Sequence, residues 1–345
     1  MSETILDVAG LTRRFGTVVA NDDVSLQVRA GEVVGLLGHN GAGKTTLVSQ
    51  LVGLLRPDAG SIRIGAVDAV ADPAAARRHV ALQPQAQAPI DGLTPRLAIE
   101  LAGRIRGLSF RDARASATRL ADELDLGRWL DRRALPEGGG ISGGVRRLTS
   151  FAMALAAPMP LLVLDEPTND IDAGRRRLLW EAVRRRGDEG SGVLVVTHNV
   201  AEAERIVDDL VVLHHGRVVA AGSPARLRGT QDSELRLELL LQPGAVDPTD
   251  GLIEAGHEQV RPVILRRVRA GRRVLATVGP EEASRAVTWA TALRREQRID
   301  GYHLGPVTLE DTYLALTRDP VDGATAETDQ AESPTTSTEE EVSHA

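Results

Sequence analysis

The stretch GHNGAGKT at residues 38–45 is the segment whose residue types and spacing most clearly allow chemistry. It fits the pattern G-x-x-x-x-G-K-[ST], in which small residues let the backbone wrap a phosphate chain with its amides pointing inward. The Lys44 ammonium can reach between β- and γ-phosphates, and the Thr45 hydroxyl can bind Mg²⁺. The predicted phosphate-binding residues are Gly38, His39, Asn40, Gly41, Ala42, Gly43, Lys44, Thr45 and Thr46.

Lys44 is also the single lysine of the chain, because the other 40 of its 41 basic residues are arginine. An ammonium on a thin stem fits between phosphates, whereas a planar guanidinium is wider and prefers a forked partner. Codon bias toward arginine accounts for the 40 arginines. The need for a narrow cation between phosphates accounts for the one lysine.

A pair of acids follows the apolar run LLVLD at 161–165. Asp165 is placed to hold magnesium through water, and Glu166 could polarise an attacking water molecule. Such a pair alone is more often a transition from strand to loop, but its position downstream of a phosphate loop favours the catalytic interpretation.

Alternating strand and helix patterns must position these residues. Buried strands are expected at 32–38, 161–165, 192–198 and 209–222, the last with a turn at Gly216. A helix is expected at 45–55, and a helical insert at 96–133. This order predicts an α/β fold for the first part of the chain.

The pattern changes after about residue 230. Alternating residues at 234–241, a hairpin at 262–278 turning at Gly271, and a helix at 280–297 predict a small α+β domain. The predicted domains are residues 1–230, with a helical subdomain at about 86–150, and residues 231–318. Residues 319–345 are expected to be a disordered acidic tail, since residues 321–345 hold seven acids and no lysine or arginine.

Composition excludes several classes. The chain has no cysteine, so it forms no disulfide or thiolate site, and only 2% of its residues are aromatic. Outside the acidic tail, 41 acids balance 41 bases, which disfavours nucleic acid as a partner. The longest apolar run, at 151–164, is too short to span a bilayer, and the start lacks signal-peptide features, so we expect a cytoplasmic protein.

Further motifs resemble the ATP-binding subunits of ABC transporters over about 220 residues. ISGGV at 141–145 looks like the signature LSGGQ, DEPTNDID resembles the D-loop with Asp172 as its aspartate, and VVTHN supplies the switch histidine His198. Gln85 in ALQPQ matches the Q-loop glutamine, and Phe15 in LTRRFG matches the aromatic residue that stacks on adenine.

This resemblance implies a P-loop NTPase nucleotide-binding domain, with a RecA-like core and a helical subdomain, that uses ATP and Mg²⁺. Glu166 and His198 would be catalytic, and Thr45, Gln85 and Asp165 would hold the metal. Ser142, Gly143 and Gly144 would meet the γ-phosphate of ATP bound by a second copy, so that ATP closes a dimer. Movement would pass through residues 86–133 to a membrane permease, which places the protein on the cytoplasmic face of the membrane.

A narrower resemblance concerns the daunorubicin/doxorubicin-resistance type of subunit. TVVANDDVSLQVRAGEVVGLLGHNGAGKTT, GLLRPDAGSIRI and VTLEDTYLALTR carry it. It implies export of a drug, antibiotic or lipid through a separate permease, and the C-terminal domain is expected to hold two subunits together. The alternative is a soluble ATP-driven switch that acts on ribosomes or nucleic acid. Its relatives carry two nucleotide domains or a long coiled-coil insert, and this sequence shows neither.

The sequence departs from the family pattern at four positions. Val145 stands where glutamine or methionine is usual, Leu148 and Met153 where arginine is frequent, and Asp170 where the D-loop has glycine. An extra carboxylate near an anionic site is expected to weaken or slow hydrolysis.

Overall fold

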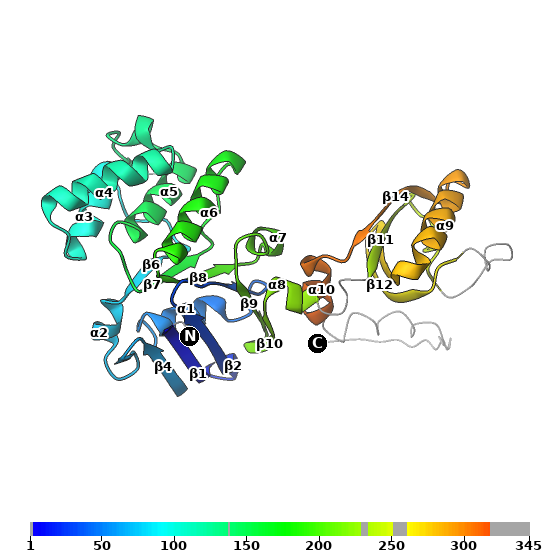
Figure 1. Ribbon diagram of the computed structural model, residues 1–345, viewed down its shortest axis with the longest axis horizontal. Helices are drawn as coiled ribbons and strands as arrows, with labels where there is room; N and C mark the ends of the chain where they lie inside the picture. Colours follow the sequence, from blue (N-terminus) through cyan, green and yellow to red (C-terminus); the bar gives the residue numbers. More distant parts are fainter. Residues whose placement is uncertain (1–2, 137–138, 229–233, 251–260, 318–345) are drawn as a thin grey trace, which may run out of the picture.

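The computed structural model describes residues 3–136, 139–228, 234–250 and 261–317. Within these residues the strands form three sheets, two in the N-terminal part and one in the C-terminal part (Figure 1). No described helix is long and apolar enough to cross a bilayer. The acidic tail predicted at 319–345 lies outside the described residues.

The central sheet has six strands in the order β10-β9-β3-β8-β7-β6. Five of them are parallel neighbours: β3 (Val33–Leu37), β6 (Val80–Gln83), β7 (Leu161–Asp165), β8 (Gly192–Thr197) and β9 (Asp209–His214). The antiparallel β10 (Arg217–Gly222) closes one edge. Strands buried on both faces read as continuous apolar runs, which is why β3, β7, β8 and β9 were predictable, whereas the short β6 was not predicted.

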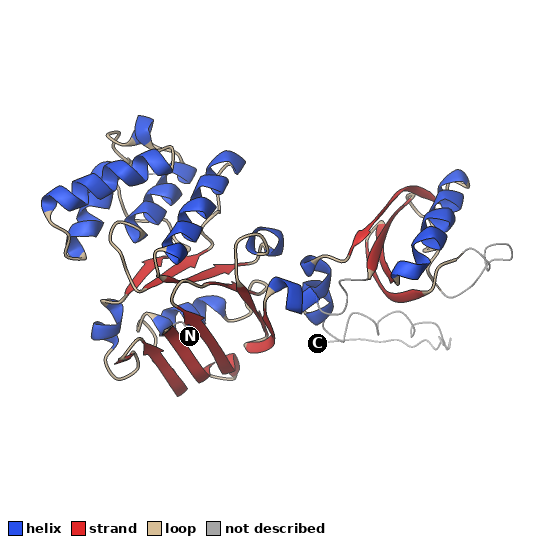
Figure 2. Cartoon of the chain, viewed as in Figure 1, coloured by secondary structure: helices blue, strands red, loops and turns tan. Residues whose placement is uncertain are grey.

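Helices cover this sheet on both faces (Figure 2). They are α1 (Lys44–Leu51), α2 (Pro73–Arg77), α6 (Ala173–Asp188) and α7 (Val200–Ala203). Helix α1 was expected to continue to residue 55, but it ends at Leu51 because Gly53 has a left-handed φ of +66°. The predicted α/β class is confirmed.

A second N-terminal sheet, in the order β2-β1-β4-β5, was not predicted. It consists of β1 (Thr4–Phe15), β2 (Val18–Arg29), β4 (Ala59–Ile64) and β5 (Val67–Asp68), all antiparallel. Its strands carry several register shifts, which blur the apolar alternation in the sequence. Apolar side chains of α1, this sheet and β3 share one core, so α1 is packed between the two sheets.

The predicted helical insert contains α3 (Pro95–Ile105), α4 (Phe110–Glu123) and the short η1 (Gly127–Trp129), and α5 (Gly143–Ala154) packs against them. The hydroxyls of Thr94, Ser109 and Ser142 accept hydrogen bonds from backbone amides in the first turns of α3, α4 and α5. Side-chain capping therefore fixes where each of these helices begins.

The C-terminal sheet has the order β12-β13-β11-β14 and is covered by one helix (Figure 1). Its elements are β11 (Leu235–Leu241), β12 (Ile264–Ala270), β13 (Arg273–Val278), η4 (Pro280–Glu282), α9 (Ala283–Arg295) and β14 (Ile299–Pro306). The hairpin turns at Gly271, whose φ is +59°. The C-terminal part has a separate hydrophobic core, in which Trp289 of α9 lies with the leucines of β11.

The last described helix returns to the N-terminal part. Helix α10 (Leu309–Leu316) packs against α7 and against α8 (Pro224–Arg228). Leu309 belongs to the large core that the central sheet shares with α3–α6, and the Thr308 hydroxyl with the Asp311 carboxylate forms a capping box. The segment predicted as the second domain, 231–318, thus contains a helix that packs on the first.

Candidate functional site

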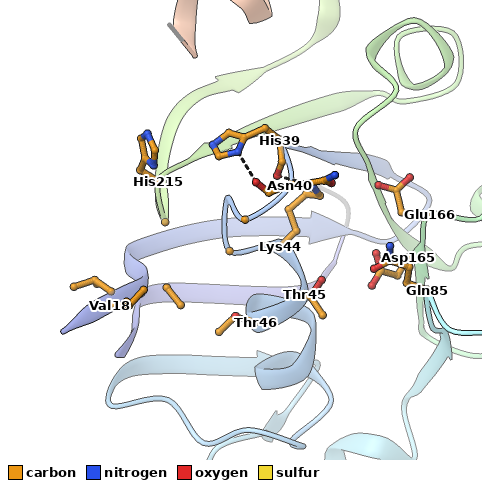
Figure 3. Close-up of a pocket in the computed structure, with 15 residues that line it drawn as sticks. Val18, His39, Asn40, Lys44, Thr45, Thr46, Gln85, Asp165, Glu166 and His215 are labelled. Carbon is orange, nitrogen blue, oxygen red and sulfur yellow. Dashed lines mark hydrogen bonds between the residues drawn. The ribbon is translucent and has the colours of Figure 1, made fainter. Parts of the chain in front are cut away.

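A pocket of about 520 Å³ opens at the carboxyl edge of the central sheet, between the loop after β3 and the residues after β7 (Figure 3). Its lining combines backbone amides, one lysine and two carboxylates. The lining residues are Val18, Val19, Ala20, His39, Asn40, Gly41, Gly43, Lys44, Thr45, Thr46, Gln85, Asp165, Glu166, His215 and Gly216. The structure therefore brings together most of the predicted phosphate-loop and metal residues.

The glycines of the phosphate loop, residues 38–46, are required by close contacts. Gly43 has a φ of +103°, and a Cβ there would lie 2.2 Å from the Ala20 carbonyl oxygen. A Cβ on Gly38 would lie 2.6 Å from the Leu213 carbonyl oxygen. The Asn21 side chain, which sequence reasoning missed, donates to the Gly43 carbonyl oxygen at 3.2 Å. The loop is thus held by β2 and β9 as well as by its own sequence.

Lys44 is the first residue of α1 and is 7% exposed. Its Nζ donates to the carbonyl oxygens of Gly38 at 2.5 Å and His39 at 3.0 Å. Burial lowers the pKa of Lys44, while the negative charges of Glu166 and Asp165 oppose that shift. The ammonium is therefore preorganised inside the loop that would receive an anion.

Asp165 and Glu166 are buried at the carboxyl end of β7. Burial, followed by repulsion from Glu166, raises the pKa of Asp165 to about 6, and Lys44 and Arg147 act in the opposite direction. The charged form of this carboxyl is therefore less stable in the site than in water, and a bound cation would offset that loss.

Glu166 is held in an unusual backbone conformation. Its φ is +49°, and its carboxylate accepts from His198 Nδ1 at 2.7 Å and from Thr197 Oγ1 at 3.2 Å. Such conformations are costly for residues other than glycine and gather at functional sites. The carboxylate is fixed by two donors from the end of β8 and the residue after it.

The predicted signature residues lie elsewhere. Ser142, Gly143 and Gly144 begin α5 and are not among the residues that line the pocket of their own chain. A Cβ on Gly144 would lie 2.6 Å from the Asp170 carbonyl oxygen, so glycine is needed there. Val145 and Leu148, two of the four departures from the family pattern, are buried in the core, and Met153 packs against it partly buried.

Arg147 of α5 was missed from the sequence. Its guanidinium donates to the carbonyl oxygens of Pro84 at 3.0 Å and Gln85 at 2.6 Å. Helix α5 is thereby tied to the segment after β6 that places Gln85 at the pocket. In the sequence it was one arginine among 40, with nothing to distinguish it.

The predicted D-loop leads into α6. Asp172 is the N-cap of α6, where its carboxylate accepts from the Arg175 amide at 3.1 Å and from its guanidinium at 3.2 Å. Asp170 has a φ of +64°, a left-handed conformation that favours glycine. This explains why a glycine suits the position and shows that aspartate occupies it under strain.

Phe15 does not line the pocket. Its ring is 47% exposed, and the Arg13 guanidinium lies 4.8 Å from the ring centroid. Instead Val18 and Val19 of β2 supply apolar lining, and His215 and Gly216 supply lining from the β9–β10 turn. In the sequence, the turn indicated by HHG at 214–216 is a signal for His215 and Gly216, and no comparable signal marks Val18 and Val19.

Comparison with known proteins agrees with this geometry. Residues 21–169 match the family model described as ABC transporter. The daunorubicin/doxorubicin resistance ATP-binding protein DrrA of Streptomyces peucetius is 33% identical over 328 residues, which cover 93% of this chain and 95% of that protein. The Nod factor export ATP-binding protein I of Rhizobium sp. (strain N33) is also 33% identical, over 92% of this chain and 98% of that protein.

A solved structure entitled "Structure of ATP binding subunit of ABC transporter" superposes with a TM-score of 0.60 at 31% identity, covering 65% of this chain and 92% of that one. The structural match supports the nucleotide-binding fold, and the similarity to DrrA extends over nearly the whole of both chains. The chain therefore belongs to the family of ABC transporter ATP-binding proteins and is an ATPase subunit of that family.

Proposed function

We propose that this chain binds Mg·ATP in the pocket, hydrolyses it, and thereby powers export of a drug, antibiotic or lipid-like compound through a separate membrane permease. The observation that carries the proposal is the meeting of Lys44, Asp165 and the Glu166–His198 pair at one edge of the sheet. The names of two similar proteins support the cargo class, since DrrA is named for daunorubicin/doxorubicin resistance and the Nod factor protein for export.

The phosphate loop would bind the triphosphate. Its amides lie at the start of α1, where the helix dipole favours an anion. Lys44 would exchange its two loop carbonyl partners for phosphate oxygens, since the carbonyl bonds show that its ammonium already points into the loop. Residues 39–41 and 43–46 line this side of the pocket, together with Val18 and Val19.

The residues present fit a magnesium ion. Mg²⁺ prefers oxygen ligands, and Thr45, Gln85 and Asp165 offer a hydroxyl, an amide oxygen and a carboxylate in the lining of one pocket. Burial and the charge of Glu166 raise the pKa of Asp165, so its charged form would be stabilised by a cation bound beside it. When bound, the metal would neutralise charge on the β- and γ-phosphates.

Glu166 would be the general base. A water molecule placed against its carboxylate loses a proton to it while the water oxygen attacks the γ-phosphorus, and ADP leaves. His198 Nδ1, at 2.7 Å, keeps the carboxylate oriented. Asp170 adds negative charge beside Arg147, and we expect it to slow this step relative to a glycine.

A second copy of the chain would complete the site. The first turn of α5 presents backbone amides beside Ser142, Gly143 and Gly144, yet these residues line no part of their own chain's pocket. We assign them to the γ-phosphate of ATP held by a partner copy. Residues 231–318 form the unit that we propose holds the two copies together.

The permease would dock on the helical subdomain. Leu97, Leu101 and Ile105 are 42%, 42% and 86% exposed. Their spacing of four residues puts them on one face of α3. An apolar stripe left in solvent is a mark of a protein interface. This docking would place the subunit on the cytoplasmic face of the membrane.

Steady-state ATPase assays with Glu166→Gln would test the proposal. The variant should still bind ATP with Mg²⁺, and its hydrolysis rate should fall roughly 10²–10⁴-fold, the usual contribution of a general base. An unchanged rate would show that Glu166 is not the base. Recovery of the wild-type chain with ribosomes, rather than with a polytopic membrane protein, would overturn the export function.

A further inference from the structure

Three histidines gather at the rim of the nucleotide pocket. His39 lies in the phosphate loop, and His214 and His215 lie at the end of β9 and in the turn that follows. The ring centroids of His39 are 5.1 Å from His214 and 5.4 Å from His215, and those of His214 and His215 are 4.1 Å apart. We propose that these side chains form a binding site for a divalent transition-metal ion of the Zn²⁺ class.

The topology fixes this meeting of residues distant in sequence. Strands β3 and β9 are parallel neighbours, with Leu37 opposite Val212. His39 and His214 each follow two residues after that pair, so both leave the sheet at the same level. The Gly216 amide donates to the Ala42 carbonyl oxygen at 3.0 Å, which holds the β9–β10 turn against the phosphate loop. The histidines therefore project from backbone segments that are already tied together.

His39 is prepared for coordination. Its Nδ1 lies 2.7 Å from the Asn40 carbonyl oxygen, which can only accept, so Nδ1 carries the proton and Nε2 carries a lone pair (Figure 3). That Nε2 is buried and has no hydrogen-bond partner among the described residues. Histidine ligands commonly donate the ring N–H that does not face the metal to a backbone carbonyl, which sets the tautomer.

The geometry suits an ion bound by imidazoles. The candidate nitrogens all lie within 4.8 Å of one another. Zinc–nitrogen bonds of about 2.0–2.1 Å in a tetrahedron place ligand atoms roughly 3.3 Å apart, so the nitrogens would have to approach one another by at most about 1.5 Å. Three imidazoles leave a fourth position for water, and neutral imidazole favours Zn²⁺, Cu²⁺ or Ni²⁺ over Mg²⁺.

Occupancy of this site would oppose nucleotide binding; this part rests on the proposed function. The His39 carbonyl oxygen accepts from Lys44 Nζ, and that ammonium must be released to reach a phosphate. A metal that ties the His39 ring to His214 and His215 stabilises the loop in the arrangement that holds Lys44. By linkage, bound ATP would lower the affinity for the metal by the same factor as bound metal lowers the affinity for ATP.

Calorimetric titration of the full, untagged, chelator-treated chain with Zn²⁺, without nucleotide, tests the site. We expect one equivalent to bind to the wild type. The double variant His214→Gln, His215→Asn should bind Zn²⁺ more than about 100-fold more weakly. Losing a residue that only hydrogen-bonds to a metal ligand already lowers metal affinity roughly 10–100-fold. Asparagine suits position 215, whose φ is +46°. His303→Gln, in β14 of the C-terminal sheet, is the matched control and should bind like the wild type.

Cobalt(II) gives a readout that needs no variant. Tetrahedral binding should produce strong visible absorption that one equivalent of Zn²⁺ removes. Binding that is absent, or equal in the double variant and the wild type, would overturn the site and show that the three rings only pack. Zinc binding with unchanged ATP affinity would overturn the coupling alone. Failure of the metal-free wild type to bind ATP with Mg²⁺, while zinc still binds, would count against the proposed function instead.

Discussion

At the scale of single residues, Lys44 offers the sharpest test, because the substitution Lys44→Arg keeps the charge and changes only the shape. The Nζ fits between two loop carbonyl oxygens at 2.5 and 3.0 Å, and a guanidinium is too wide for that position. We expect ATP binding to weaken strongly and kcat to fall by at least about 100-fold, the cost of losing one donor to transition-state charge. Fluorescent-nucleotide titration and phosphate release measure the two effects.

Arg177→Lys is the control for Lys44→Arg. Arg177 is an exposed residue of α6 that pairs with Glu181 one turn away at 2.5 Å. Exposed pairs of this kind contribute less than about 1 kcal/mol, so binding and turnover should stay at the wild-type level. Normal turnover by Lys44→Arg would show that charge alone is sufficient in the loop.

The residues that sequence reasoning found and missed differ in a physical way. Lys44, Asp165 and Glu166 act within a few residues of a strand end, so local spacing indicates them. His215 reaches the pocket through the pairing of β3 with β9, and Val18 through tertiary contacts that hold β2 against the phosphate loop; no local pattern encodes either arrangement. Arg147 likewise depends on a tertiary contact with the segment after β6.

At the scale of elements, the same distinction separates the two N-terminal sheets. The buried parallel strands appear in the sequence as unbroken apolar runs such as LLVLD at 161–165. The antiparallel β1 and β2 are half-buried and interrupted by register shifts, and β1 has another antiparallel partner in β4. Their pairing could not be read from alternation alone.

Helix α3 carries a prediction at this scale. Replacing Leu101 by Asp should weaken association with the permease by roughly 30-fold or more, the cost of a central apolar contact of about 2 kcal/mol. Co-purification from detergent-solubilised membranes measures it. Because Leu101 is 42% exposed and outside the main core, thermal stability should change little.

Leu54→Asp provides the matched control for this prediction. Leu54 is more exposed than Leu101, but it lies in the turn after α1, away from the helical subdomain. It should leave permease recovery unchanged. Equal recovery of the Leu101→Asp and wild-type chains would place the docking surface elsewhere.

At the scale of the whole molecule, the chain passes through the C-terminal sheet and returns to the nucleotide domain. Helix α10 packs on α7 and α8, and Arg236 of β11 holds Asp311 of α10 at 3.1 Å, so one short helix contacts both parts (Figure 1). Removing everything after residue 230 would therefore delete part of the first domain's packing together with the second domain. Point substitutions in α10 separate the two effects.

Leu309→Ala should destabilise the nucleotide domain. Leu309 is 2% exposed within the large core, and truncating a buried leucine costs about 2–5 kcal/mol. The chain has three tryptophans, and Trp129 and Trp180 lie against this core while Trp289 lies in the C-terminal one. In a Trp289→Phe background, urea unfolding followed by tryptophan fluorescence thus reports on the first domain alone.

The midpoint of urea unfolding should fall for Leu309→Ala. It should stay constant for Leu314→Ala, the control, because Leu314 is an exposed leucine of the same helix. An unchanged midpoint for Leu309→Ala would mean that α10 belongs energetically to the C-terminal unit, and truncation near residue 230 would then be a clean test of dimerisation.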